Sequence, residues 1–264
     1  MRGWGPAGEA PDILIRSMQV IQPVNFTNTR VVPTVRGEQG GDSMTYTLYA
    51  APGACSRVPM MALEEAGADF DVELVRFMRG AHRAPDFLAL NPAGKVPVLV
   101  TPDGPLTENV AIATYLAGRH PGLLPDLSDP YEAARITANL AYVSSTLHPI
   151  VTRIRMPMFM ADGDAAQGSV REKAMEMMRM HATTVDAALG AGPWWYGDDW
   201  SVQDAYVYWV WFRITGAGFP GEDYPAWAAH AARMEARASV QRALARDARL
   251  QAMLENEGLA VPMR

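Results

Sequence analysis

The stretch TYTLYAAPGACSRVPMMALEEAGADFDVEL, residues 45–74, changes its apolar period twice. Apolar and polar residues alternate over residues 45–50, which is typical of a strand, and Pro52-Gly53 then forms a turn. From Ser56 to Ala66 the apolar spacing becomes helical, and Gly67 follows where a helix ends. Alternation returns over residues 70–74. Two strands joined by a helix predict a right-handed parallel β-α-β unit.

The next residues predict the rest of a small α/β domain over residues 44–121. A short helix fits residues 85–90. Two antiparallel strands, residues 96–101 and 106–107, flank a Pro-Asp-Gly-Pro turn, and a third helix begins at Glu108.

Residues 128–264 carry helical patterns throughout, which predicts a second, all-helical domain. Apolar residues recur at helical spacing from Pro130 to Ile154, with a kink expected at Pro149. Ser169 to Glu172 has the pattern of a capping box that opens a helix running to Gly190. Ser201 to Asp204 has the same pattern and opens a further helix.

Residues 1–43 are rich in proline and glycine and show no lasting apolar period. They also lack the charged start and apolar core of a secretory signal. We expect this segment to be a disordered extension or the result of a misassigned start codon.

Composition excludes several classes of protein. The net charge of -6 over 264 residues offers no basic field for nucleic acid, and no apolar run is long enough to cross a membrane. Cys55 is the only cysteine, so no internal disulfide can form and a cytoplasmic location is favoured. No metal-ligand spacing is present.

Four motifs make this pattern specific. They are Ala51 to Ser56, Ala62 to Gly67, Asn91-Pro92-x-Gly94-Lys95-Val96-Pro97, and Leu106 to Ile112. In order and spacing they resemble the thioredoxin-like domain of bacterial, beta-class-like glutathione S-transferases. The stretch Trp195 to Ala205 resembles the same family, in which this capping box nucleates a central buried helix. The resemblance implies a thioredoxin-like domain followed by an all-helical domain, glutathione as co-substrate, a role in detoxification and a homodimer.

Cys55 and Ser56 are the candidate catalytic residues of the turn. They lie at the positive end of the first helix, where free N–H groups stabilise an anion, and we expect the pKa of Cys55 to be lowered there. In the family this cysteine lies beside the glutathione sulfur, and its neighbour holds the thiolate. The alternative is a small buried cysteine followed by a helix-capping serine.

The resemblance also implies how the tripeptide is held. The backbone of Val96, before a cis Pro97, would pair with the cysteinyl part of glutathione. Glu108 and Asn109 would receive the γ-glutamyl ammonium and carboxylate. Arg79 is the candidate for the glycyl carboxylate, with His82 and Arg83 as alternatives.

His148 is the candidate site residue of the helical domain. Helical spacing places it on the border of the apolar stripe, where it could face the cleft between the domains, and the family has a functional histidine in a matching Leu-His context. The alternative is a histidine with only a structural role. Met156, Met158 and Phe159 are candidates for an apolar electrophile pocket, although core packing explains them equally well.

These observations predict a glutathione transferase that conjugates the glutathione thiol to hydrophobic electrophiles. One alternative is glutathione-dependent thiol-disulfide exchange or isomerisation through Cys55. A second is a binding module that keeps the fold without turnover.

Overall fold

The computed structural model describes residues 45–260. Four strands form one sheet in the order β2-β1-β3-β4. Their bounds are β1 Tyr46–Ala50, β2 Phe70–Leu74, β3 Val98–Thr101 and β4 Gly104–Thr107. The extension predicted over residues 1–43 lies outside the described residues.

The sheet confirms the predicted strand pairing. Strand β1 runs parallel to β2, while β3 is antiparallel to both β1 and β4. Tyr46, Leu48 and Ala50 are fully buried, as the alternation in the sequence predicts. The parallel pair is connected by helix α1 (Arg57–Glu65), so the β-α-β unit is present.

Two further helices complete this domain, α2 (Pro85–Leu90) and α3 (Asn109–Arg119). Helix α1 packs against α3 and also against two helices of the second domain, α7 and α9. The residues that join β1 to α1, among them Cys55, therefore lie where the two domains meet.

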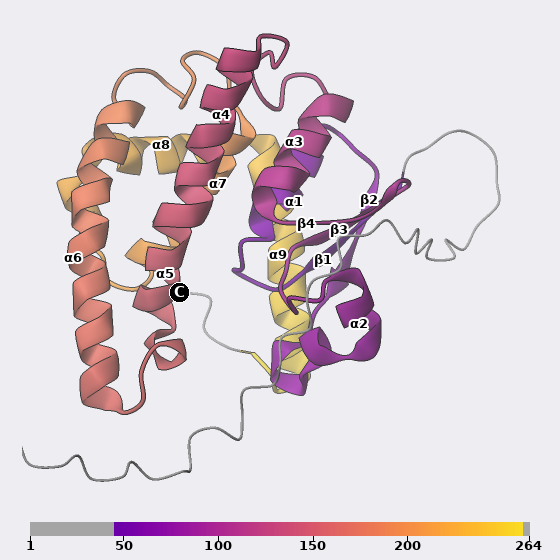
Figure 1. Cartoon of the computed structure of the whole chain (residues 1–264), viewed down its shortest axis with the longest axis vertical. Coiled ribbons are helices and arrows are strands. Elements are labelled where there is room, and N and C mark those ends of the chain that lie inside the picture. The colour runs from indigo at the N-terminus through magenta and orange to yellow at the C-terminus, as the bar shows by residue number, and fades with distance from the viewer. Residues whose placement is uncertain (1–44, 261–264) are drawn as a thin grey trace, which may run out of the picture. The chain divides into compact units, whose positions relative to one another are not determined.

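The second domain is all-helical (Figure 1). Its helices are α4 Pro130–Tyr142, α5 His148–Arg155, α6 Asp164–Leu189, α7 Val202–Thr215, α8 Pro225–Ala236 and α9 Ala238–Asn256. Helix α7 is buried on nearly every side and packs against α1, α5 and α8, which makes it the central helix that the resemblance implied. No helix within residues 45–260 is long and apolar enough to span a membrane.

The two predicted capping boxes have different outcomes. At the start of α7, Asp204 accepts hydrogen bonds from the backbone N–H and the hydroxyl of Ser201, each at 2.9 Å, so this box is confirmed. The box predicted at Ser169 is wrong, because α6 begins five residues earlier, at Asp164. Asp164 stabilises the first turn through the helix dipole, and residues up to Ser169 continue the helix. The predicted end at Gly190 is confirmed.

The kink expected at Pro149 takes the form of a π-helical turn, Val143–Leu147, between α4 and α5. The N–H of His148 donates to the carbonyl of Val143, five residues back. Proline has no N–H to bond the carbonyl four residues earlier and its ring crowds that carbonyl, so a wider turn relieves the clash.

Candidate functional site

The turn that carries Cys55 is held by two helices of the second domain. The N–H of Gly53 donates to both carboxylate oxygens of Asp247 on α9, each at 3.2 Å. The carbonyl of Gly53 accepts the indole N–H of Trp209 on α7 at 3.1 Å. Gly53 has a φ of 67°, a conformation that favours glycine. The turn is thus fixed before any ligand binds.

Cys55 is partly exposed, and its thiol donates to the carbonyl of Val96 at 3.5 Å. Burial of the sulfur raises the pKa of Cys55 to about 12, and the nearby side-chain amide of Asn109 offsets only part of this rise. A thiol that donates to a carbonyl is also favoured in its protonated form. The lowered pKa expected from the helix terminus is therefore wrong for this structure, in which Cys55 is a neutral thiol.

Ser56 lies fully buried beneath the turn. Its hydroxyl donates to the carbonyl of Ala51 and accepts the N–H of the same residue, both at 3.3 Å. No side-chain cap bond joins it to α1. The hydroxyl braces the turn from within, and this position does not favour the direct contact with a thiolate that we predicted.

The loop before β3 presents the backbone of Val96 to Cys55. The Val96-Pro97 peptide bond is cis, as the resemblance implied. The buried side chain of Asn91 braces the loop, since it donates to the carbonyl of Lys95 at 2.8 Å and accepts the N–H of Ala93 at 3.0 Å. Gly94 lies against the segment that connects β2 to α2. A Cβ atom added to Gly94 would be only 2.9 Å from the carbonyl oxygen of His82.

Glu108 and Asn109 open helix α3 beside this loop. Glu108 is exposed and has a φ of 68°, the one positive φ of a non-glycine residue among residues 45–260. Such strain gathers at functional sites, and no sequence pattern around Glu108 predicts it. Asn109 is 6% exposed, and its side-chain oxygen is buried without a hydrogen-bond partner in the described part of the chain. The site therefore holds an acceptor that no described donor satisfies.

The guanidinium of Arg79 lies 3.4 Å from the carboxylate of Glu257, at the end of α9. Arg76 holds the same carboxylate at 2.7 Å. The Nδ1 atom of His82 is buried without a partner within residues 45–260, and burial lowers the pKa of that ring. Arg79 would have to leave Glu257, in part, to reach a ligand carboxylate.

His148 is brought to the same site by α5. Its Nδ1 lies 2.8 Å from the hydroxyl of Tyr206 on α7, and its ring packs edge-on against Trp209 with centroids 4.4 Å apart. The side-chain amide of Asn109 lies close enough to influence both Tyr206 and Cys55. Tyr206 and Trp209 were missed in the sequence; their spacing of three residues on a helix, which puts them on one face, was the available signal.

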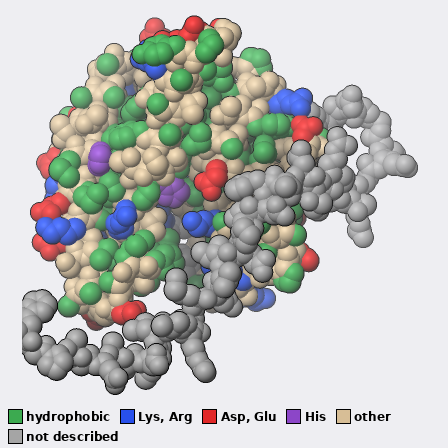
Figure 2. Space-filling model, in the orientation of Figure 1, with side chains coloured by type: hydrophobic (Ala, Val, Ile, Leu, Met, Phe, Trp, Pro, Cys, Tyr) green, Lys and Arg blue, Asp and Glu red, His purple; other side chains and the backbone are tan. Residues whose placement is uncertain are grey.

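Positive charge surrounds this histidine. Burial, followed by Lys95 and Arg213, lowers the pKa of His148 to about 4, so the ring is neutral at pH 7. Burial, followed by Arg155 and Arg57, lowers the pKa of Arg213 to about 10. Figure 2 shows basic side chains and a histidine gathered on the viewed face between α5 and the sheet. Lys95, exposed beside Val96, is a cation that the sequence reasoning passed over.

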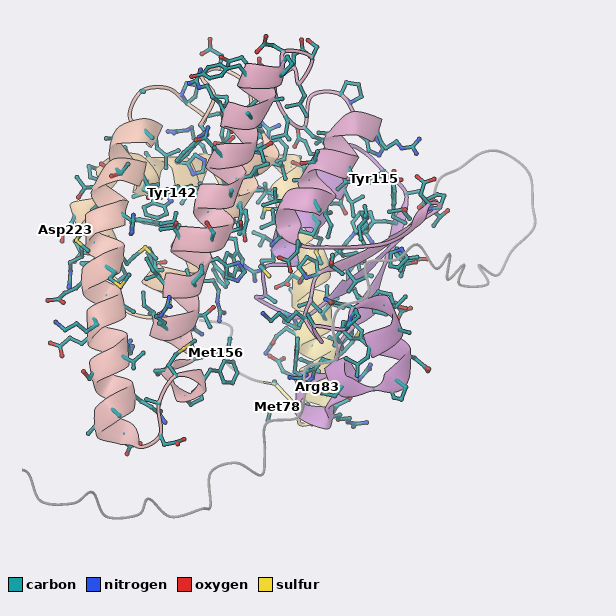
Figure 3. All side chains as sticks on the ribbon, in the orientation of Figure 1. Met78, Arg83, Tyr115, Tyr142, Met156 and Asp223 are labelled. Atoms are coloured by element: carbon teal, nitrogen blue, oxygen red, sulfur yellow. The ribbon has the colours of Figure 1, made fainter. Side chains whose placement is uncertain are left out.

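The candidate pocket residues lie on the surface at the end of α5. Met156, Met158 and Phe159 are 37%, 52% and 68% exposed. Figure 3 places Met156 below α5, on the side that faces Met78 and Arg83 of the first domain. The three side chains are not core, and their role in an electrophile pocket stays a prediction.

Comparisons with known proteins agree with this geometry. The family model "Glutathione S-transferase, N-terminal domain" matches residues 44–118. Glutathione S-transferase GST-4.5 of Xanthomonas campestris is 34% identical over 80% of this chain and 98% of its own length. The maleylacetoacetate isomerase of Pseudomonas aeruginosa is 31% identical over 61% of this chain and 76% of its own.

Solved structures give the same result over both domains. A sphingomonad glutathione S-transferase complexed with glutathione is 33% identical, with a TM-score of 0.67 over 76% of this chain and 98% of its own. A beta-class enzyme of Sphingomonas chungbukensis is 32% identical, with the same TM-score and the same coverage. Because the likeness spans nearly the whole of these proteins, including the turn at Cys55 and the loop at Val96, the chain belongs to the glutathione S-transferase family.

Proposed function

We propose that this protein conjugates the thiol of glutathione to hydrophobic electrophiles. The observation that carries the proposal is the unsatisfied buried oxygen of Asn109 beside the thiol of Cys55. A buried acceptor without a donor is unfavourable, so the site is suited to a ligand that brings an N–H group. The γ-glutamyl ammonium of glutathione offers such a group, and the exposed carboxylate of Glu108 would attract the same ammonium. The γ-glutamyl carboxylate would then be received by the N-terminus of α3, where Asn109 lies, rather than by the oxygen of Asn109.

The remaining parts of glutathione have partners close by. The backbone of Val96 would pair with the cysteinyl residue, and its carbonyl, now bonded to Cys55, would then release that thiol. The freed S–H would donate to the glutathione sulfur and favour its thiolate. Arg79, shared with Glu257, and the exposed Lys95 are the cations for the glycyl carboxylate.

The chemical step needs little beyond ionisation and proximity. The thiol proton of glutathione passes to solvent, the sulfur forms a bond to the electrophilic carbon, and the leaving group departs with its bonding electrons. Met156, Met158 and Phe159 would hold the apolar acceptor. A homodimer, a cytoplasmic location and a role in detoxification stay predictions that rest on the family resemblance.

A second function is glutathione-dependent disulfide exchange or isomerisation through Cys55, favoured by the similarity to a maleylacetoacetate isomerase. The exchange reaction is disfavoured because the thiol of Cys55 is neutral, whereas the attacking species in exchange is a thiolate.

A panel assay tests these proposals. The protein is incubated with glutathione and, in turn, an aryl halide, an epoxide, a disulfide, a peroxide and a cis-enone. Conjugation of the aryl halide supports the proposed function, and turnover of the disulfide or the enone alone supports the second. Glutathione binding in calorimetry without any turnover would favour a non-catalytic binding module.

A further inference from the structure

Within the described part of the chain, Tyr206 is the one residue that forms a hydrogen bond with the imidazole ring of His148, and glutathione binding as proposed above does not use it. Its hydroxyl lies 2.8 Å from Nδ1 of His148, and the residue is 1% exposed. The two rings meet edge to face with centroids 5.9 Å apart. A buried phenol usually has a hydrogen-bond partner for its hydroxyl, so it matters which of the two groups donates the proton.

The direction follows from the neighbours of the hydroxyl. Within residues 45–260 the hydroxyl of Tyr206 has one hydrogen-bond partner, Nδ1 of His148, and the side-chain oxygen of Asn109 accepts from no described donor. A buried hydroxyl is stabilised when its proton reaches an acceptor. The phenol has a single proton, which is then left for Nδ1 of His148. Burial raises the pKa of Tyr206 above its ordinary value, so this proton stays on the phenol at pH 7.

The state of His148 is fixed in turn. A neutral imidazole carries one N–H, and because Nδ1 accepts from Tyr206, the proton is on Nε2. Nε2 has no hydrogen-bond partner among residues 45–260, and it is not among their buried unsatisfied atoms. His148 itself is partly exposed. An N–H donor therefore remains available on the side of the ring that faces away from Tyr206.

We propose that Tyr206 is a positioning residue: its hydroxyl holds His148 as the Nε2–H tautomer, which donates to the acceptor substrate where negative charge develops. The inference rests on the proposed function, because that function supplies the electrophilic substrate to which His148 would donate. This N–H would stabilise the transition state of substrates whose negative charge develops on an oxygen, such as nitroaryl halides and conjugated ketones. Simple alkyl halides develop no such charge.

The experiment reads the tautomer directly. In protein labelled with ¹⁵N-histidine, the chemical shifts of the ring nitrogens distinguish a protonated nitrogen from an unprotonated one, and loss of signals in His148→Gln assigns the residue. We expect Nε2–H in the wild type and a shift toward the other tautomer in Tyr206→Phe. In the same variant, kcat with a nitroaryl halide should fall about tenfold while KM for glutathione stays within about twofold, the loss of one donor in the transition state.

Tyr142→Phe is the matched control. The hydroxyl of Tyr142 lies 3.0 Å from Nδ1 of His181, so this variant removes the same kind of bond from another histidine. Figure 3 labels Tyr142 on the α4 and α6 side of the molecule, away from Met78 and Arg83. We expect kcat, KM and the His148 spectrum to stay as in the wild type.

Several outcomes would overturn the proposal. An Nδ1–H tautomer in the wild type refutes it without any variant, even if Tyr206→Phe does not fold. A folded Tyr206→Phe with an unchanged kcat, or a loss of kcat equal to that of Tyr142→Phe, also refutes it. A wild type that conjugates none of the panel would overturn the proposed function and the acceptor half of the inference, while the nitrogen spectrum would still decide the tautomer.

Discussion

Asp247 binds the backbone N–H of Gly53 with both of its carboxylate oxygens, although 194 residues separate the two in the sequence. The same carboxylate accepts from the guanidinium of Arg57 at 2.6 Å and 2.9 Å, and neither side chain is more than 6% exposed. The last helix of the second domain thus holds the turn that carries Cys55 in the first. The stability of the chain and the geometry of its site are linked at this contact.

Removing this carboxylate should destabilise the protein strongly. We expect Asp247→Ala to lower the free energy of unfolding by about 3–5 kcal/mol, because it leaves the buried Arg57 charge without its carboxylate. Urea denaturation measures the loss. The control is Asp103→Ala, since the pair between Asp103 and Arg119 is 62% and 44% exposed and should be worth less than about 1 kcal/mol. Equal losses in the two variants would show that the burial of the pair is unimportant.

Asp204 should matter far more than an ordinary capping residue. Its carboxylate accepts hydrogen bonds from Ser201, from the backbone N–H of Trp195 at 2.8 Å and from Nε2 of His230 at 3.0 Å. The residue is fully buried. We expect Asp204→Ala to lower the unfolding free energy by more than about 3 kcal/mol, and Ser201→Ala by about 0.5–2 kcal/mol. Denaturation midpoints of the two variants check this. A loss for Asp204→Ala no larger than that for Ser201→Ala would mean that the other two bonds contribute nothing.

The thiol of Cys55 should resist alkylation at neutral pH. A pKa raised to about 12 means that the thiolate is scarce at pH 7, and its fraction grows about tenfold with each pH unit. The rate of alkylation by iodoacetamide should therefore climb steadily from pH 7 to pH 10, as read by intact mass. Free cysteine, whose pKa is about 8.5, should level off above pH 9 in the same series. A plateau for the protein below pH 8 would contradict the neutral thiol.

Substitutions at Cys55 separate the two candidate reactions. Cys55→Ser keeps a donor beside the glutathione sulfur, so kcat/KM for an aryl halide should stay within about tenfold of the wild type. Cys55→Ala removes that donor and should cost about 10- to 100-fold. Both variants should lose any adduct with oxidised glutathione, because no other cysteine exists in the chain. Conjugation in Cys55→Ala equal to that of the wild type would show that the thiol takes no part in it.

The sequence predicted the architecture well because local patterns determine it. The alternation around Tyr46 and Leu48, the proline and glycine turns, and the capping box at Ser201 each have a physical cause within a few residues. The start of α6 was mistaken because a capping pattern at Ser169 also fits the interior of a helix. A pattern of four residues cannot exclude a helix that has already begun.

The candidate site was only partly predictable, because its chemistry depends on distant contacts. The helix terminus at Cys55 favoured an ionised thiol, but the burial of the sulfur, which no local pattern reports, has the larger effect. The hydroxyl of Ser56 bonds the carbonyl of Ala51 in the same turn, which the helix-capping pattern does not predict. Tyr206 meets His148 only after α5 and α7 have packed, so its role could not be read from either segment alone.

The π-helical turn between α4 and α5 sets the rotational phase of everything that follows it. One residue more per turn rotates the later side chains by about 100° relative to an uninterrupted α-helix. Counting along a regular helix places His148 at the border of the apolar stripe; in the structure the residue is partly exposed and its ring meets Tyr206 of α7. The direction in which this imidazole points is therefore encoded by the number of residues between Val143 and Leu147, and a deletion of one residue there would turn it away without changing any side chain of the site.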